Sequence, residues 1–306
     1  MNRFLKNVFL FILVVSVAYP FMVFLSGYLP ISKALKLNLK YRRGSYGHMY
    51  TRLNEVKQLD GHVDILFLGS SHSYRGFDPR NFKDKKTFNL GSSSQAPIQT
   101  KILLKRYLSK INPKIVIYEV YPGTFVADGV ESSLDLIAND NNDFESVKMA
   151  FELNNIDTYN TLIYAYFAKF LNLNKKFVEP IIKDDDTYIS GGFVEKKIKY
   201  YKYENISKID VWKLNKKQIE KFEENIALLK QKKIKIILVY APITKALYNS
   251  FTNNIYIDSL MNSYGLPYYN FNQMIQLDDS LDFNDSHHLN QNGVNKFNSK
   301  LNAILK

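Results

Sequence analysis

Beyond about residue 55, short apolar runs alternate with longer stretches in which apolar residues recur every three or four positions. Short apolar runs bounded by turn-forming residues are typical of strands buried on both faces, and the longer amphipathic stretches are typical of helices. Strands that alternate with helices usually form a mostly parallel sheet with both faces covered. The pattern therefore predicts an α/β fold, a three-layer α/β/α sandwich.

The predicted sheet has five strands, at residues 64–68, 85–90, 114–120, 234–240 and 267–271. The predicted helices of the outer layers lie at residues 96–108, 213–230, 245–264 and 291–305.

The stretch from 124 to 210 interrupts this alternation. It separates the third and fourth strands, where a crossover normally needs only a dozen or more residues. We interpret it as an insertion or cap. Its pattern predicts helices at 144–153 and 159–171, and loops at 139–143, 184–186 and 191–192.

The N-terminal part of the chain predicts a membrane anchor. Val8 to Leu29 is a run of 22 residues without a charge, long enough to cross a hydrocarbon core of about 30 Å as a helix. A cleaved signal peptide would have a shorter apolar run, followed by a small-residue cleavage site. We therefore expect a short tail at 1–7, a transmembrane helix at 8–29, a basic linker at 30–55 and one domain at 56–306.

The charges that flank the predicted span do not settle its orientation. More basic residues follow the span than precede it, so a positive-inside count would place the domain in the cytoplasm. Between Lys33 and Arg43, basic residues alternate with leucines and Tyr41. That composition suits a segment lying along anionic lipid, and it also suits a solvated linker.

The composition limits the partners and the kinds of reactive site that the chain can have. The 41 basic and 29 acidic residues give a net charge of +12, which makes acidic glycans, anionic lipids or nucleic acid conceivable partners. No recognition motif for nucleic acid accompanies the charge. The absence of cysteine excludes disulfides, thiolate metal sites and a cysteine nucleophile. The acidic triplet 184–186 lacks the spacing of a metal site, so neither a metal nor a cofactor is predicted.

Two short motifs could carry chemistry. Gly69-Ser70-Ser71 follows the first strand, and Asp285 stands three positions before His288, just ahead of the last helix. A serine hydroxyl becomes a nucleophile only when a base takes its proton, and a carboxylate can orient that base. Each motif also has an ordinary interpretation, because Gly-Ser-Ser is a common turn and Asp285 could cap a helix.

The order of these motifs resembles the SGNH or GDSL hydrolase superfamily over about residues 60–123 and 232–303. Gly69-Ser70-Ser71 stands where that family has Gly-Asp-Ser, and Asp285 with His288 matches its last block. The segment 88–92 is similar to its second block, with Gly91 at the oxyanion position. The third block, Gly-x-Asn-Asp, is absent, and Glu119-Val120-Tyr121-Pro122-Gly123 stands in its place.

The resemblance implies a Ser-His-Asp triad of Ser71, His288 and Asp285. It also implies that the backbone N–H groups of Ser71 and Gly91 stabilise an oxyanion. The residues left open as a third donor are Ser92, Ser93, Ser94, Gln95 and Tyr121. For His72 we expect packing or a secondary role, with contact to substrate as the alternative.

Together with the anchor, the pattern resembles a membrane-tethered branch that includes the lipoteichoic acid D-alanylation protein and alginate-type O-acetylation proteins. That resemblance implies a domain outside the cytoplasm that works with a multi-spanning membrane-bound O-acyltransferase on an envelope glycan or another polyanionic polymer. We therefore expect O-acyl transfer. The alternatives are an envelope carbohydrate esterase or deacetylase, and a non-catalytic binding or assembly subunit that kept the fold.

Overall fold

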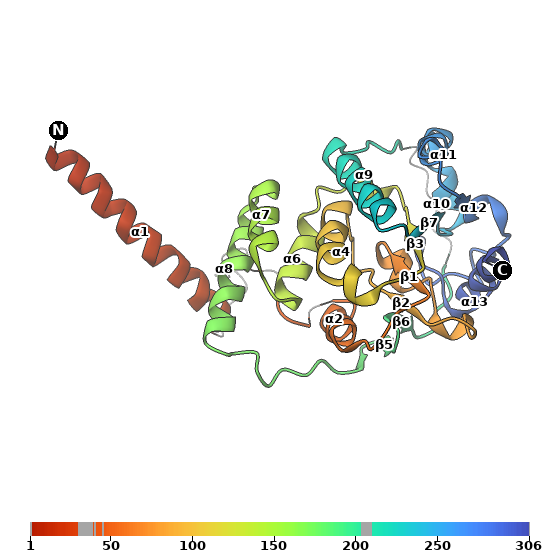
Figure 1. Cartoon of the computed structure of the whole chain (residues 1–306), viewed down its shortest axis with the longest axis horizontal. Helices are drawn as coiled ribbons and strands as arrows, with labels where there is room; N and C mark the ends of the chain where they lie inside the picture. The colour runs from red at the N-terminus through yellow and green to blue at the C-terminus, as the bar shows by residue number, and fades with distance from the viewer. Residues whose placement is uncertain (1, 30–38, 40, 45, 203–209, 306) are drawn as a thin grey trace.

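The computed structural model describes residues 2–29, 39, 41–44, 46–202 and 210–305. A long N-terminal helix, α1 (Asn2–Tyr28), projects from a rounded domain (Figure 1). Most of the predicted basic segment between Lys33 and Arg43 lies outside the described residues. Two of its described residues, Leu39 and Tyr41, are buried against the domain.

Helix α1 is long and apolar enough to cross a membrane, and its best window has a mean hydropathy of 2.7. A signal sequence would share these features. The last third of α1 packs on helix α8 (Ile156–Phe170). The Phe24 ring lies 5.2 Å from the Phe167 ring and 6.4 Å from the Tyr164 ring. A Cβ atom on Gly27 would lie only 2.4 Å from Tyr164, so glycine permits this close approach.

The central sheet has five parallel strands in the order β2-β1-β3-β7-β8. Their bounds are β1 Ile65–Leu68, β2 Thr87–Asn89, β3 Ile115–Glu119, β7 Lys235–Tyr240 and β8 Tyr268–Asn270. This confirms the predicted five-stranded α/β fold. Every predicted strand is present, each one to three residues shorter than the apolar run that predicted it.

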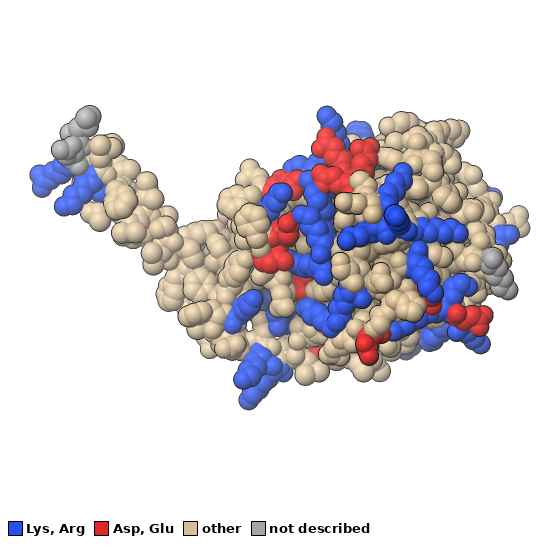
Figure 2. Space-filling view, viewed as in Figure 1, with Lys and Arg blue, Asp and Glu red and all other residues tan. Residues whose placement is uncertain are grey.

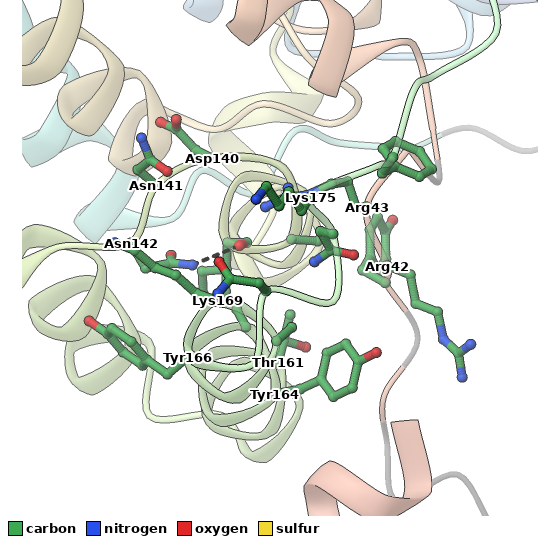
Figure 3. A pocket seen from close by; sticks show the side chains of 18 residues that line it. Arg42, Arg43, Asp140, Asn141, Asn142, Thr161, Tyr164, Tyr166, Lys169 and Lys175 are labelled. Atoms are coloured by element: carbon green, nitrogen blue, oxygen red, sulfur yellow. Dashed lines mark hydrogen bonds between the residues drawn. The ribbon is translucent and has the colours of Figure 1, made fainter. Parts of the chain in front are cut away.

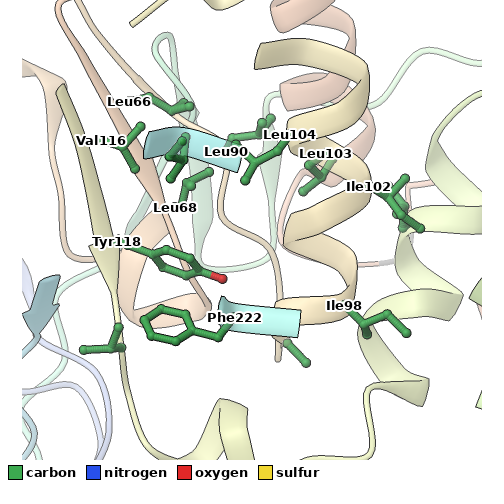
Figure 4. Close-up of a cluster of buried hydrophobic side chains, with 14 of the residues drawn as sticks. Leu66, Leu68, Leu90, Ile98, Ile102, Leu103, Leu104, Val116, Tyr118 and Phe222 are labelled. Carbon is green, nitrogen blue, oxygen red and sulfur yellow. The ribbon is translucent and has the colours of Figure 1, made fainter. Parts of the chain in front are cut away.

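Successive residues of a strand point to opposite faces of the sheet, so the core has two layers, one on each face. Leu66 and Leu68 of β1 face α4 (Pro97–Ile111) and α9 (Lys216–Gln231), as Figure 4 shows for part of this cluster. Ile65 and Phe67 belong to the opposite cluster, which includes Phe297 of α13 (Gln291–Ile304). Covering helices on both faces explain why the strands read as continuous apolar runs.

The predicted helix at 245–264 is two helices, α10 (Lys245–Asn249) and α11 (Asn254–Ser263). Tertiary contacts break it. The Phe251 ring stacks on Trp212 at a centroid distance of 3.5 Å, and the indole N–H of Trp212 donates to Asn254 Oδ1 at 3.0 Å. These contacts hold the chain between the two helices in a non-helical path that amphipathic spacing cannot reveal.

The segment 124–210 forms a group of helices next to α1 and a small antiparallel sheet next to β2 (Figure 1). Its elements are α5 Gly123–Val126, α6 Val130–Asn139, α7 Phe144–Leu153, α8, β4 Ile182–Lys183, β5 Asp186–Ile189 and β6 Phe193–Lys196. The helix predicted at 144–153 matches α7, and α8 begins three residues before its prediction. The sequence reasoning did not predict α6 or the small sheet.

The folded domain begins earlier than the predicted boundary at residue 56. Helix α2 (Met49–Gln58) buries Met49, Leu53 and Val56 in the same cluster as Leu66. The predicted linker at 30–55 therefore ends in an element of the domain core. The remaining short helices are α3 Ser71–Tyr74, η2 Pro79–Asn81 and α12 Phe271–Met274.

Phe222 tests the packing of α9 on the sheet. Its ring is fully buried and lies 5.1 Å from the rings of both Tyr118 and Phe125. Phe222→Ala should lower the free energy of unfolding by about 3–5 kcal/mol because it leaves a cavity. Phe144→Ala, on a side chain that is 77% exposed, should change it by less than about 0.5 kcal/mol. Urea unfolding of the two variants measures the difference, and equal effects would contradict this description of the core.

Candidate active site

The two predicted motifs meet at the carboxyl edge of the sheet. Strand β1 ends at Leu68, and Gly69, with φ of +135°, turns the chain so that Ser71 becomes the first residue of α3. Asp285 and His288 lie in the loop that precedes α13. Ser71 and His288 are 217 positions apart in the sequence, and the parallel strand order brings them together.

The predicted triad residues form a continuous hydrogen-bonded chain. His288 Nε2 lies 2.8 Å from Ser71 Oγ, and His288 Nδ1 lies 2.9 Å from Asp285 Oδ1. Asp285 Oδ1 also accepts the backbone N–H groups of His287 at 2.9 Å and His288 at 2.8 Å. This arrangement can hold the imidazole with Nδ1 protonated and Nε2 facing the serine hydroxyl.

Asp285 is placed to remain ionised. Burial by itself would raise the pKa of Asp285, but the hydrogen bonds and charge of His288 and the two backbone N–H groups hold that pKa well below its usual range. An ionised carboxylate stabilises the imidazolium that forms when His288 takes a proton. The geometry therefore suits general-base chemistry at Ser71, while the catalytic role of the three residues stays a prediction.

Ser71 and His288 open into a cavity of about 320 Å³. One side of this cavity is the carboxyl edge of the sheet, with Ser70, Ser71 and His288. The other side comes from α5 and the start of α6, which contribute Thr124, Gly129 and Glu131. The insertion therefore supplies one wall of the pocket, next to the predicted nucleophile.

Glu119 at the end of β3 is a site residue for which the sequence pattern predicted no role. Its Oε2 accepts the N–H of Ser70 at 3.1 Å and the Ser70 hydroxyl at 3.0 Å, while Oε1 accepts the N–H of Tyr121 at 2.6 Å. Burial raises the pKa of Glu119 to about 7. The carboxylate ties the serine turn to β3, at the place where the family's third block is absent. A charged residue ending an apolar strand was the available sequence signal.

Gly91, the predicted oxyanion donor, has another partner for its backbone N–H in this structure. Its backbone N–H donates to Asn89 Oδ1 at 2.9 Å, and Gly91 is not part of the cavity wall. A Cβ atom at Gly91 would lie 2.8 Å from the carbonyl oxygen of Gly69 and 3.0 Å from that of Ser70. A glycine is needed here because two backbone segments approach closely, which a sequence match cannot distinguish from an oxyanion donor.

The remaining candidate donors can be sorted by the partners of their backbone N–H groups. Ser92 donates to Gly69 and Gln95 donates to Ser92, each at 3.3 Å, and the N–H of Tyr121 is bound to Glu119. Among the described residues we find no acceptor for the N–H groups of Ser71, Ser93 and Ser94. Ser71 and Ser94 line the cavity, and Ser94 adopts a left-handed conformation with φ of +49°. These two amides are therefore the candidate oxyanion donors.

His72 and Tyr121 pack behind the triad. The His72 ring lies 4.1 Å from the Tyr121 ring and 5.2 Å from the His288 ring, and its Nδ1 lies 3.1 Å from Ser70 Oγ. Burial, with the neighbouring His288 and His287, holds the pKa of His72 well below its usual range. The Tyr121 hydroxyl lies 3.2 Å from His287 Nδ1. This geometry agrees with a packing role for His72, although both rings also reach the cavity wall.

Within the described ranges, no group of three or more His, Asp or Glu side chains is arranged to hold a metal ion. Two members of the acidic triplet form ion pairs instead. Asp186 binds Arg75 through two hydrogen bonds of 2.7 and 2.8 Å, and Asp185 pairs with Lys199.

Comparisons with known proteins were made by sequence and by structure. No protein-family model and no curated protein matches the chain. A solved structure described as a candidate acylhydrolase from Bacteroides fragilis matches with 10% identity and a TM-score of 0.41, covering 86% of this chain and 99% of the other. A GDSL-like lipase from Bacteroides thetaiotaomicron matches with 12% identity and a TM-score of 0.41, covering 85% and 97%.

The parallel five-stranded sheet, with the serine turn after β1 and the Asp-His pair before the last helix, agrees with the SGNH/GDSL hydrolase-like fold that the sequence resemblance implied.

The pH dependence of the free energy of unfolding tests whether Glu119 is buried. Its pKa is raised from 4.5 to about 7, so between these values the folded protein holds a proton that the unfolded chain has lost. The free energy of unfolding should therefore fall as the pH rises from 4.5 to 7. Urea unfolding across this range should give a shallower decline for Glu119→Gln than for the wild type. Equal slopes would show that Glu119 does not titrate in this window.

Proposed function

We propose that the protein is a membrane-anchored serine enzyme of acyl-ester chemistry, with O-acyl transfer to a cell-envelope polysaccharide or teichoic acid as its reaction. The observation that supports this most is the chain of contacts from Asp285 through His288 to Ser71, with a distance of 2.8 Å at the serine. A nucleophile, a base and an orienting carboxylate in this order define the serine acyl-transfer mechanism.

The first half-reaction transfers the acyl group to the enzyme. His288 Nε2 takes the proton of Ser71 Oγ as that oxygen attacks the ester carbonyl carbon. The negative charge on the carbonyl oxygen is met by the amides of Ser71 and Ser94, at the start of α3 and in the turn after β2. The C–O bond to the leaving alcohol then breaks, His288 returns the proton to that alcohol, and an acyl-serine remains.

The second half-reaction repeats these steps with an acceptor hydroxyl. His288 takes the acceptor's proton as the acceptor oxygen attacks the acyl carbon. The C–O bond to Ser71 then breaks, and His288 returns the proton to Ser71 Oγ. A sugar or polyol hydroxyl gives transfer, and water gives hydrolysis. The wall formed by α5 and α6 faces the nucleophile, which is where an acceptor must lie, so we assign acceptor choice to the insertion.

The anchor gives the proposed setting. Lys and Arg side chains lie at the free end of α1, and the middle of the helix shows none (Figure 2). We propose that α1 spans the cytoplasmic membrane with the domain on its outer side, where a multi-spanning membrane-bound O-acyltransferase would deliver the acyl group. A tethered enzyme is suited to a polymer that is built at the same membrane.

Replacement of the nucleophile tests the chemistry directly. Ser71→Ala should lower hydrolysis of p-nitrophenyl acetate by at least about 10³-fold, because no other group forms the acyl intermediate. Ser259→Ala is the matched control, since this exposed serine lies on α11 and hydrogen-bonds only the backbone of Ile255. Unchanged turnover in Ser71→Ala would refute the catalytic role and favour the non-catalytic alternative.

Asp285→Asn tests the orienting role without removing the nucleophile. The amide can present its NH₂ group to His288 and favour the wrong tautomer, so turnover should fall by about 10⁴-fold while the protein stays folded. The comparison is made on purified full-length protein by steady-state kinetics together with circular dichroism. Activity within threefold of the wild type would contradict the proposed triad.

Acyl content of the envelope separates transfer from hydrolysis. In cells that carry Ser71→Ala in place of the wild type, O-acyl groups on the envelope polymer should decrease if the enzyme adds them. They should increase if the enzyme is an esterase or deacetylase. Ester-linked acyl groups are released by mild alkali and quantified by mass spectrometry, which shows whether the acyl content has decreased or increased.

A further inference from the structure

A second cavity, of about 410 Å³, lies on the side of the domain next to the anchor. Its walls are α8, the loop between α6 and α7, and the chain at 41–43 that follows the anchor (Figure 3). It is separate from the catalytic cavity, because the two share no lining residue.

Three basic side chains line this cavity without an acidic partner. The Arg43 guanidinium lies 5.0 Å above the ring of Tyr50, and its Nε atom is buried with no hydrogen-bond partner. Lys169 and Lys175 are exposed at the cavity, and within the described part of the chain we find no acidic residue paired with either of them.

The one acidic residue in the wall does not neutralise these cations. Asp140 accepts hydrogen bonds from Arg106 at 2.7 Å and from the Tyr107 hydroxyl at 2.6 Å, and it pairs with Lys57 at 2.8 Å. Its side chain is 0% exposed. The cavity therefore has an excess of positive charge, which calls for an anion.

The position of α1 places this cavity at a bilayer surface. The sixteen residues from Arg3 to Ala18 are free of the domain and cover about 24 Å, less than the hydrocarbon thickness of about 30 Å. A spanning α1 must therefore bring the region where it packs on α8 to the membrane. Tyr164 of α8 contacts Phe24 of α1 and also lines the cavity.

Exposed apolar side chains stand close in sequence to the two lysines of the cavity. Phe170 is 83% exposed, Val178 is 82% exposed and Leu171 is 46% exposed; they lie within three residues of Lys169 or Lys175 and do not themselves line the cavity. Exposed aromatic and aliphatic side chains interleaved with lysine suit the boundary between headgroups and acyl chains. A soluble anion would gain nothing from these apolar side chains.

We propose that this cavity binds the phosphate headgroup of an anionic phospholipid of the membrane that α1 crosses. Arg43, Lys169 and Lys175 meet the phosphate, and the exposed apolar residues contact the acyl chains. The proposal rests on α1 spanning a membrane but not on the chemistry at Ser71. Bound lipid would fix the domain at a set height and orientation above the bilayer.

Native mass spectrometry of the full-length protein tests this. The protein is purified in a neutral detergent that contains equal amounts of phosphatidylglycerol and phosphatidylcholine, and the lipids that stay bound are counted. The wild type should retain phosphatidylglycerol in preference. Arg43→Gln combined with Lys175→Gln should reduce that retention by about tenfold or more. Arg43→Lys alone, which keeps the charge, should retain most of it.

The control removes the same charge elsewhere. Lys232, directly after α9, and Lys300, on α13, are exposed, and changing both to glutamine should leave retention unchanged. Ser71→Ala should also retain the lipid, which separates this result from any failure of the catalytic proposal.

Two outcomes would overturn the proposal. One is equal retention of both lipids, or retention unaffected by the Arg43 and Lys175 changes. The other is binding of inorganic phosphate or glycerol phosphate in lipid-free detergent as tight as that of phosphatidylglycerol, since this would assign the cavity to a soluble anion.

Discussion

The contact between Ser71 Oγ and His288 Nε2 is the interaction on which the functional account depends. It joins residues that are 217 positions apart in the sequence. The serine hydroxyl becomes a nucleophile only when the imidazole takes its proton. The parallel sheet makes it possible, because β1 ends directly before the serine turn and the loop before α13 reaches the same edge. The two core clusters, one on each face of the sheet, fix that edge and therefore the distance between the two side chains.

A buried carboxylate holds the serine turn in place. Glu119 receives both the amide and the hydroxyl of Ser70, so the turn is tied to the neighbouring strand β3. In the family that the sequence resembles, aspartate is usual at the position of Ser70 and an Asn-containing block follows the third strand. Here Ser70 and Glu119 occupy those two places and bind each other. The departure from the family pattern has a structural role in this chain, and it is not by itself a sign of lost activity.

Sequence reasoning identified what short-range patterns encode. The five strands are marked by continuous apolar runs, and the pairing of Asp285 with His288 follows from their spacing. It missed features that depend on distant contacts. Helix α6 combines a polar, serine-containing first turn with apolar residues and lacks a side-chain cap at Gly129. It also missed that the amide of Gly91, the predicted oxyanion donor, donates to Asn89, because this partner depends on how the chain turns after β2.

The insertion connects the two cavities. Glu131 in the first turn of α6 lines the catalytic cavity, and Ile137 near its end lines the membrane-side cavity. Six helical residues separate them by about 9 Å. One short helix thus links the proposed lipid site to the wall that faces the proposed nucleophile.

The rate at which a fluorophosphonate modifies Ser71 measures the central contact most directly. Peptide mapping by mass spectrometry locates the adduct, and its rate of formation is compared between the wild type and His288→Gln, both of which keep the serine. The account predicts an adduct on Ser71 that forms at least about 10³-fold more slowly without the imidazole. Equal rates in the two proteins, or modification of a different serine in the wild type, would contradict it.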